Sequence, residues 1–168
     1  MSAPVLTRKI CLLGRLAVGK TSLVRRFVEN VFDERYQTTV GVSIHTKTLN
    51  INAQTIKLII WDIAGFEQVA HYQQYLRGSH GVLWVADGTE PASWQKLLAI
   101  HQNHQSIHAV PGVCLINKHD LLDQWRIRNE DIAHLQKVFG FVLFSSAKTG
   151  ENVEQGFTEL AKRLLKDQ

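Results

Sequence analysis

Residues 14–21 form a glycine-rich segment, Gly-Arg-Leu-Ala-Val-Gly-Lys-Thr, with the spacing G-x-x-x-x-G-K-S/T. This segment, called the phosphate loop below, lies between the apolar run 10–13 and a helical sequence. In that setting, loop N–H groups and the start of the helix converge on a phosphate. Lys20 supplies a mobile ammonium for the outer phosphates, and the Thr21 hydroxyl can ligate Mg²⁺. The pattern predicts a nucleoside-triphosphate site with phosphate contacts from Ala17, Val18, Gly19, Lys20, Thr21 and Ser22.

Two segments that follow buried strand-like runs can read the base, Asn-Lys-His-Asp at 117–120 and Ser-Ser-Ala-Lys at 145–148. The Asp120 carboxylate can accept hydrogen bonds from N1–H and N2–H₂ of guanine, a donor pair that adenine lacks. The Lys118 stem can lie over the base, Asn117 can join neighbouring loops, and an N–H in 145–148 can donate to guanine O6. Taken alone, 117–120 is equally well a polar turn.

The segment 61–65, Trp-Asp-Ile-Ala-Gly, ends another strand-like run and can serve the metal and the terminal phosphate. Asp62 is suited to the Mg²⁺ shell, and the missing side chain of Gly65 lets its N–H approach a phosphate. With the base-reading segments, this favours guanine nucleotide and Mg²⁺ as ligands. An ATPase is a more distant alternative.

Strand and helix patterns alternate along the chain. Apolar runs predict strands over 9–13, 41–49, 55–61, 81–86, 113–116 and 141–144, and helical spacing predicts helices over 20–29, 72–76, 131–138, 153–164 and from Pro91 onward. The short link 50–52 implies an antiparallel hairpin. We expect an α/β protein with a mostly parallel sheet covered by helices on both faces. Ligands of such sheets bind at the carboxyl ends of the strands, where every motif falls.

Composition and charge fit a single soluble domain, because 168 residues are 45% hydrophobic and 20% charged. The net charge of +4 is dispersed along the chain. This distribution argues against a nucleic-acid partner. No run is long enough to span a membrane. Cys11 and Cys114 lie in apolar runs and are expected to be buried free thiols in a reducing compartment. We expect a cytoplasmic monomer without a C-terminal lipidation cysteine, recruited to membranes through a partner or a tail that this chain lacks.

Three histidines, His101, His104 and His108, recur at spacings of three and four along the sequence expected to form a helix. This spacing could form a metal-binding face. Because no carboxylate or cysteine completes the set, a solvated helix face is the preferred interpretation.

In the order and type of its motifs, the chain resembles the Ras superfamily of small GTPases over essentially its whole length. The segments that carry the resemblance are 14–21, 62–65, 117–120 and 146–148, together with Thr39. Residues 39–42, 61–62 and 75–78 are most similar to the Rab branch. The resemblance implies one GTPase domain over 1–168, with a core of about 7–166 and a six-stranded sheet with one antiparallel strand. It also implies a molecular switch that binds GTP or GDP with Mg²⁺.

The resemblance further implies roles that the motifs alone do not reveal. Phe32 would pack edge-on against guanine, and Tyr36 would cover the phosphates. Thr39 would bind Mg²⁺ and the γ-phosphate in the GTP state, and with Lys20 would stabilise the transition state and position water. The implied nucleotide contacts are Ala17, Val18, Gly19, Lys20, Thr21, Ser22, Phe32, Tyr36, Thr39, Gly65, Asn117, Lys118, Asp120, Ser146, Ala147 and Lys148, and the implied metal ligands are Thr21, Thr39 and Asp62.

Partner binding is implied for the segments whose conformation follows the nucleotide. Loss of the γ-phosphate would release the segments 33–42 and 64–77. Effectors and regulators are therefore expected at about 33–44 and 61–77. There Ile44, Trp61 and Tyr75 would form part of the surface, and ordinary sheet and helix packing is the alternative for these three.

Two positions depart from the family pattern in a way that disfavours hydrolysis. Phe66 stands where a glutamine usually orients the attacking water, and a phenyl ring cannot do so. Leu16, the third residue of the phosphate loop, would crowd the entry of a partner's arginine. Arg15 could instead act as an arginine finger from within the same chain and stabilise the transition-state charge. A solvent-facing Arg15 is the preferred interpretation. We expect either a switch with slow GTP hydrolysis or a GTP-bound scaffold with little cycling.

Overall fold

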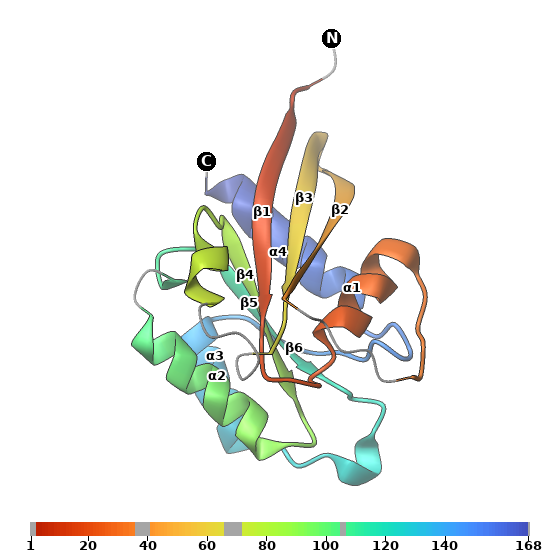
Figure 1. The fold of residues 1–168 in the computed structure, drawn as a ribbon, viewed down its shortest axis with the longest axis vertical. Coiled ribbons are helices and arrows are strands. Elements are labelled where there is room, and N and C mark those ends of the chain that lie inside the picture. Colours follow the sequence, from red (N-terminus) through yellow and green to blue (C-terminus); the bar gives the residue numbers. More distant parts are fainter. Residues whose placement is uncertain (1–2, 36–40, 66–71, 105–106, 168) are drawn as a thin grey trace.

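The computed structural model describes residues 3–35, 41–65, 72–104 and 107–167. Its six strands form one sheet in the order β2-β3-β1-β4-β5-β6 (Figure 1). They are β1 (Val5–Leu13), β2 (Val42–Ile51), β3 (Gln54–Ile63), β4 (Gly81–Asp87), β5 (Gly112–Asn117) and β6 (Val142–Phe144). β2 pairs antiparallel with β3, and every other pair is parallel. The predicted sheet, including its antiparallel hairpin, is confirmed.

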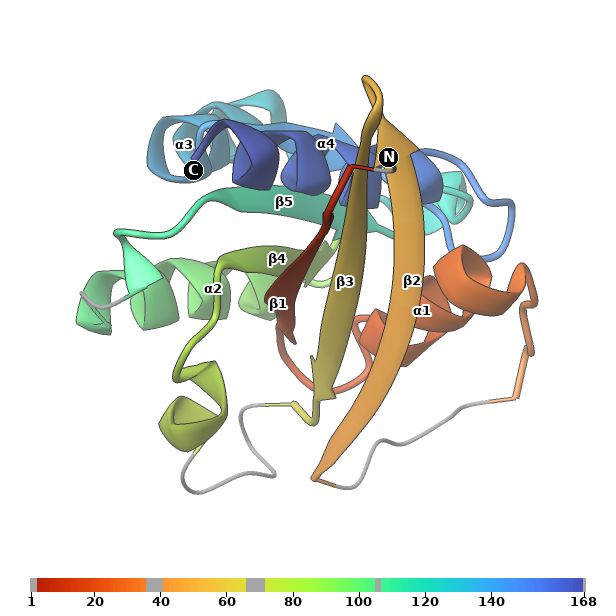
Figure 2. The same ribbon diagram turned by 90° about the horizontal axis from the view of Figure 1, so that it is seen from above.

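Helices cover both faces of the sheet, as predicted (Figures 1 and 2). α1 (Lys20–Glu29) and α4 (Val153–Lys166) pack on one face, and α2 (Pro91–Asn103) and α3 (Asn129–Phe139) pack on the other. Two short 3₁₀ helices, η2 (Tyr72–Leu76) and η4 (Leu122–Gln124), lie in connections. η2 has the bounds of the helix predicted over 72–76, and the structure shows that it is a 3₁₀ helix. Within the described ranges, no helix has the length and apolar character needed to cross a bilayer.

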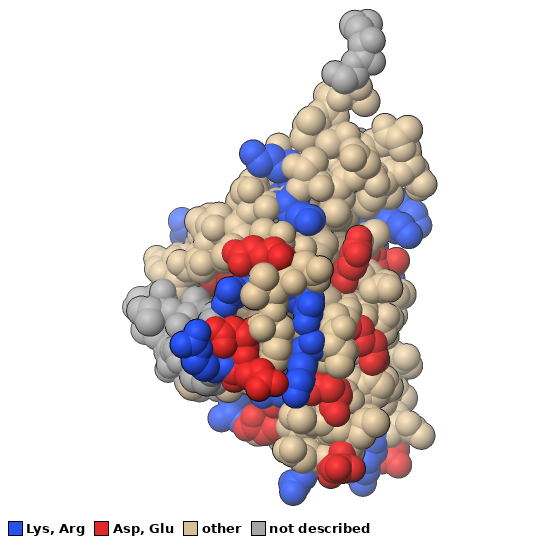
Figure 3. Space-filling view, turned by 90° about the vertical axis from the view of Figure 1, so that its right-hand side faces the viewer, with Lys and Arg blue, Asp and Glu red and all other residues tan. Residues whose placement is uncertain are grey.

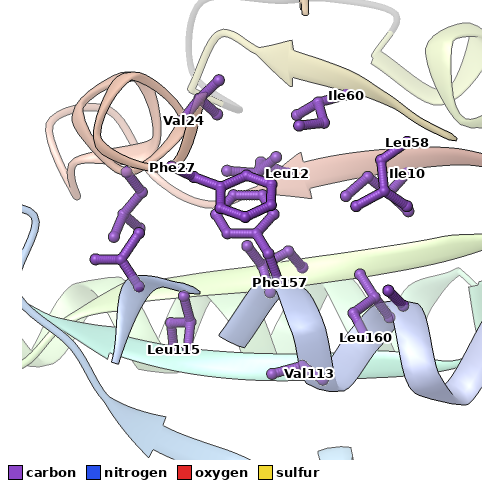
Figure 4. Close-up of a cluster of buried hydrophobic side chains, with 14 of the residues drawn as sticks. Ile10, Leu12, Val24, Phe27, Leu58, Ile60, Val113, Leu115, Phe157 and Leu160 are labelled. Atoms are coloured by element: carbon purple, nitrogen blue, oxygen red, sulfur yellow. The ribbon is translucent and has the colours of Figure 1, made fainter. Parts of the chain in front are cut away.

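Alternation along the central strand divides the core into two layers. Ile10 and Leu12 of β1 face α1 and α4, whereas Cys11 and Leu13 face α2 and α3. In the first layer, the ring of Phe157 lies between the sheet and α1 (Figure 4). This core holds the sheet and α1 in fixed relation, so that the loops at the carboxyl ends of the strands keep their positions.

Replacing Phe157 with alanine is expected to cost about 3–5 kcal/mol of unfolding free energy. Its side chain is fully buried and its ring stacks on Phe27 with centroids 4.1 Å apart. The half-buried Phe141 is the matched control, and Phe141→Ala should cost clearly less. Urea unfolding of both variants measures the difference, and equal losses would contradict this description of the core.

The three histidines do not share one helix, because α2 ends at Asn103 and His108 lies beyond it. His101 packs against Trp84, with ring centroids 5.5 Å apart, and stacks on His108 at 4.1 Å. Burial, and secondarily the charge of His108, lower the pKa of His101. Among the described residues no group of three or more His, Cys, Asp or Glu side chains could hold a metal. His101 therefore has a packing role rather than a place on a solvated face.

Cysteine burial and the charge of one face can be compared with the expectations from composition. Cys11 and Cys114 are buried free thiols, and burial raises the pKa of Cys114 to about 12. On the face drawn in Figure 3, Lys and Arg side chains lie among Asp and Glu side chains. That face therefore carries no extended field of one sign.

Candidate nucleotide site

A cavity of about 460 Å³ opens at the carboxyl ends of β1, β3 and β5. In Figure 1 this edge of the sheet lies opposite the start of β1 and the end of α4. Four motifs that are far apart in the sequence, 14–21, 61–65, 117–120 and 145–148, meet there. The predicted residues that line the cavity are Ala17, Gly19, Lys20, Thr21, Ser22, Phe32, Gly65, Asn117, Lys118, Asp120, Ala147 and Lys148.

The other predicted site residues do not line the cavity or are not described. Val18, Asp62 and Ser146 are fully buried just behind the lining. Tyr36, Thr39 and Phe66 lie outside the described residues, so their predicted roles remain predictions.

The phosphate loop wraps around the amine of Lys20. Lys20 Nζ donates to the carbonyl oxygens of Gly14 and Arg15, each at 3.0 Å, and the side chain is only 6% exposed. Gly19, with φ of 103°, precedes α1, and a Cβ there would lie 2.4 Å from Asn117 Nδ2. The loop path thus requires glycine, and the ammonium is held at the cavity wall beside the start of α1.

Two oxygen-bearing side chains meet where α1 begins and β3 ends. Thr21 Oγ1 donates to Asp62 Oδ2 at 2.6 Å, and Asp62 is fully buried at the end of β3. A hydroxyl and a carboxylate at this separation are hard oxygen donors that fit Mg²⁺, which normally keeps several waters and few protein ligands.

The third residue of the phosphate loop lies directly against Gly65. A Cβ built on Gly65 would be 2.4 Å from the backbone nitrogen of Leu16 and 2.9 Å from its Cβ. Leu16 also lines the cavity. Only glycine fits at position 65, and the Leu16 side chain begins where the loop and the end of β3 meet.

Asn117 joins the phosphate loop to the loop after β6. Its Nδ2 donates to the carbonyl of Val18 at 3.0 Å, and its Oδ1 accepts from Ser145 Oγ at 3.2 Å and from Ala147 N at 3.3 Å. The side chain is 2% exposed. One buried amide therefore fixes the spacing between the phosphate loop and the 145–148 segment.

Two further side chains of the 117–120 segment, Asp120 and Lys118, are each held by a partner. Asp120 Oδ1 accepts from Ser146 Oγ at 2.7 Å, which orients the carboxylate beside the cavity. Lys118 Nζ lies 3.0 Å from Asp87 Oδ2 at the end of β4. The sequence reasoning missed Asp87, because its contact with Lys118 exists only once β4 and β5 pair.

The contacts of Arg15 disfavour a role in catalysis. Its Nη1 donates to Glu90 Oε1 at 2.8 Å, in the connection that precedes α2. Arg15 does not line the cavity, whereas its neighbours Leu16 and Ala17 do. The structure thus favours the expectation that Arg15 has no catalytic role.

The expected partner surface is partly exposed and partly packed. Ile44 lies opposite Trp61 in the β2–β3 pair and is 54% exposed. The Trp61 and Tyr75 rings are half-buried, with centroids 6.3 Å apart. Lys9 Nζ lies 3.7 Å from the Trp61 ring centroid and donates to the Tyr75 carbonyl at 2.6 Å. Trp61 and Tyr75 thus pack in part against each other and Lys9, whereas Ile44 is exposed; the role of all three toward a partner stays a prediction.

Fold and site together define a nucleotide-binding α/β domain of the phosphate-loop class. The sequence model of the Ras family matches residues 9–166. The chain is 36% identical over 161 residues to "Ras-related protein Rab-1" of Theileria annulata, covering 93% of this chain and 73% of that protein. It is 37% identical over 164 residues to "Ras-related protein RABF2b" of Arabidopsis thaliana (93% and 80%) and 33% identical over 168 residues to "Ras-related protein Rab-18" of Caenorhabditis elegans (98% and 83%). The chain belongs to the Ras family, as a Rab-like small GTPase that acts as a GTP-binding switch.

Proposed function

We propose that this protein holds GTP or GDP with Mg²⁺ in the cavity at the carboxyl ends of the strands and hydrolyses GTP slowly. The observation that carries the proposal is the convergence of Lys20, the Thr21–Asp62 pair and Asp120 on one cavity. Residues 7–166 would form the working domain. It would act as a cytoplasmic monomer, recruited to membranes through a partner.

Binding would use opposite sides of the cavity for the two ends of the nucleotide. Lys20 would exchange its loop carbonyls for phosphate oxygens, while Thr21 and Asp62 would hold Mg²⁺ with Thr39 added in the GTP state. Asp120 would accept from N1–H and N2–H₂ of guanine, Lys118 and Phe32 would flank the base, and Tyr36 would cover the phosphates. The N–H groups of 146–148 would face O6.

Slow hydrolysis is supported by two residues with no suitable chemistry. Leu16 lines the cavity beside Gly65, where a γ-phosphate and an incoming arginine would meet. Phe66 cannot orient water through a hydrogen bond. Neither residue supplies a side-chain group that holds guanine, phosphate or Mg²⁺, so binding would persist while hydrolysis is slow.

A second candidate function is a GTP-bound scaffold that presents the surface around Ile44, with little cycling. The bulk of Leu16 at the cavity wall favours it, and the Thr21–Asp62 pair and Gly65 favour a working switch. The two share one pocket and differ in the nucleotide that they carry.

Denaturing freshly purified protein and identifying the released nucleotide tests both. We expect guanine nucleotide in close to equimolar amount. Bound GTP would favour the scaffold or a very slow switch, and bound GDP would favour a cycling switch. Recovery of adenine nucleotide, or of none after gentle purification, would contradict the proposed function.

A further inference from the structure

Arg26 of α1 donates hydrogen bonds to the backbone of the loop that follows β6. Its Nε donates to the carbonyl of Ala147 at 2.8 Å, and its Nη2 donates to the carbonyl of Lys148 at 2.5 Å. The third guanidinium nitrogen, Nη1, donates to Asn30 Oδ1 at 3.3 Å, one turn further along. A planar fork that meets two successive carbonyls fixes both their distance and their direction.

The backbone of Ala147 is therefore held on both sides of its Cα. Its N–H donates to Asn117 at 3.3 Å, while its carbonyl accepts from Arg26. Ala147 and Lys148 both line the cavity, but Arg26 does not. The guanidinium lies behind the loop and acts on its geometry without reaching the cavity.

Helix α1 gives Arg26 a rigid base. Phe27, the next residue, is buried and stacked on Phe157 of α4. The same helix begins at Lys20, inside the phosphate loop. Arg26 thus ties the base-reading loop to the element that starts at the phosphates.

We propose that Arg26 is a positioning residue for guanine recognition, which sets the backbone N–H groups of 146–148 at the depth where they meet O6 of the base. The proposal rests on the proposed function, because it assigns the guanine edge to this loop. Without the fork, the 147–148 peptides lose two charge-assisted hydrogen bonds and the loop relaxes from that depth. Asp120 lies in a different loop and is linked to this one through Ser146 Oγ, which donates to Asp120 Oδ1 at 2.7 Å. Its contacts with N1–H and N2–H₂ therefore depend on Arg26 less than the contact with O6 does.

The test compares nucleotide release from Arg26→Met, Arg26→Lys and the control Arg25→Met. Arg25 is the neighbouring arginine of α1 and pairs with Glu29, 3.7 Å away. The ligands are GDP, inosine diphosphate, which keeps O6 and N1–H but lacks the N2 amino group, and 2-aminopurine riboside diphosphate, which keeps the N2 amino group but lacks O6 and N1–H. Each variant is compared with the parent for the same ligand, so the lower affinity of the last analogue cancels.

Arg26→Met is expected to release GDP and inosine diphosphate about tenfold faster than the parent, and the 2-aminopurine analogue less than about twofold faster. Arg26→Lys, which keeps the charge but not the fork, should fall between and carries the comparison if the methionine variant fails to fold. Arg25→Met should match the parent.

Equal release rates for Arg26→Met and Arg25→Met would overturn the inference, as would equal acceleration for all three ligands, which marks a merely structural role. If the parent binds no guanine nucleotide, the proposed function fails and the inference falls with it.

Discussion

Replacing Asp120 with asparagine is expected to weaken GDP binding by about 10²-fold or more. Guanine would lose its charged acceptor, and each hydrogen bond to a charged group is worth about 1.5–3 kcal/mol. An amide that faces N1–H and N2–H₂ leaves at least one of these donors unpaired. The fold should survive, because an asparagine oxygen can still accept from Ser146 Oγ, now 2.7 Å from Asp120 Oδ1.

The same variant should gain affinity for xanthosine diphosphate. Xanthine carries a carbonyl oxygen at C2 where guanine carries an amino group, so the asparagine N–H can donate to it. Release rates of GDP and xanthosine diphosphate measure the switch of preference. Asp123→Asn, an exposed carboxylate in η4, is the matched control and should leave both rates unchanged. If Asp120→Asn keeps parental GDP binding, Asp120 does not read the base.

Replacing Leu16 with glycine is expected to raise single-turnover GTP hydrolysis at least about tenfold, and adding Phe66→Gln should raise it further. The first change removes an isobutyl group from the cavity wall beside Gly65. The second restores a side chain that can orient water. Release of inorganic phosphate from preloaded protein gives the rate, without a contribution from nucleotide exchange.

The Arg15→Ala variant tests whether Arg15 itself takes part in GTP hydrolysis. Because Arg15 donates to Glu90 rather than lining the cavity, its loss should leave the hydrolysis rate unchanged. A marked loss would assign Arg15 the role of a finger. If Leu16→Gly or Phe66→Gln hydrolyses GTP no faster than the parent, the interpretation of that position is wrong.

Local chemistry made the sheet and α1 predictable from the sequence. α1 begins at Lys20 and ends at Glu29 as predicted, since the φ of 103° at Gly19 and the left-handed Asn30 bound it. The region 72–76 was harder, because five residues cannot separate a 3₁₀ from an α helix by spacing. The packing of His101 against Trp84 could not be predicted, because it depends on the strand order.

The residues of the candidate site also differ in how far the sequence predicts them. Lys20, Asp62 and Asp120 were identified by type and spacing, because their chemistry is fixed by the side chain itself. Asp87 and Arg26 were not, because their roles exist only once distant loops meet. Tertiary contacts that brace a site leave no local signature in one sequence, whereas ligand-facing groups do.

Competition binding tests the central claim most directly. Nucleotide-free protein is saturated with a fluorescent GDP in the presence of Mg²⁺ and titrated with GTP or with ATP. The account predicts that GTP displaces the probe at a concentration lower than ATP by about 10³-fold or more, because adenine lacks the donor pair that Asp120 requires. Displacement by ATP at the same concentration as GTP would contradict it.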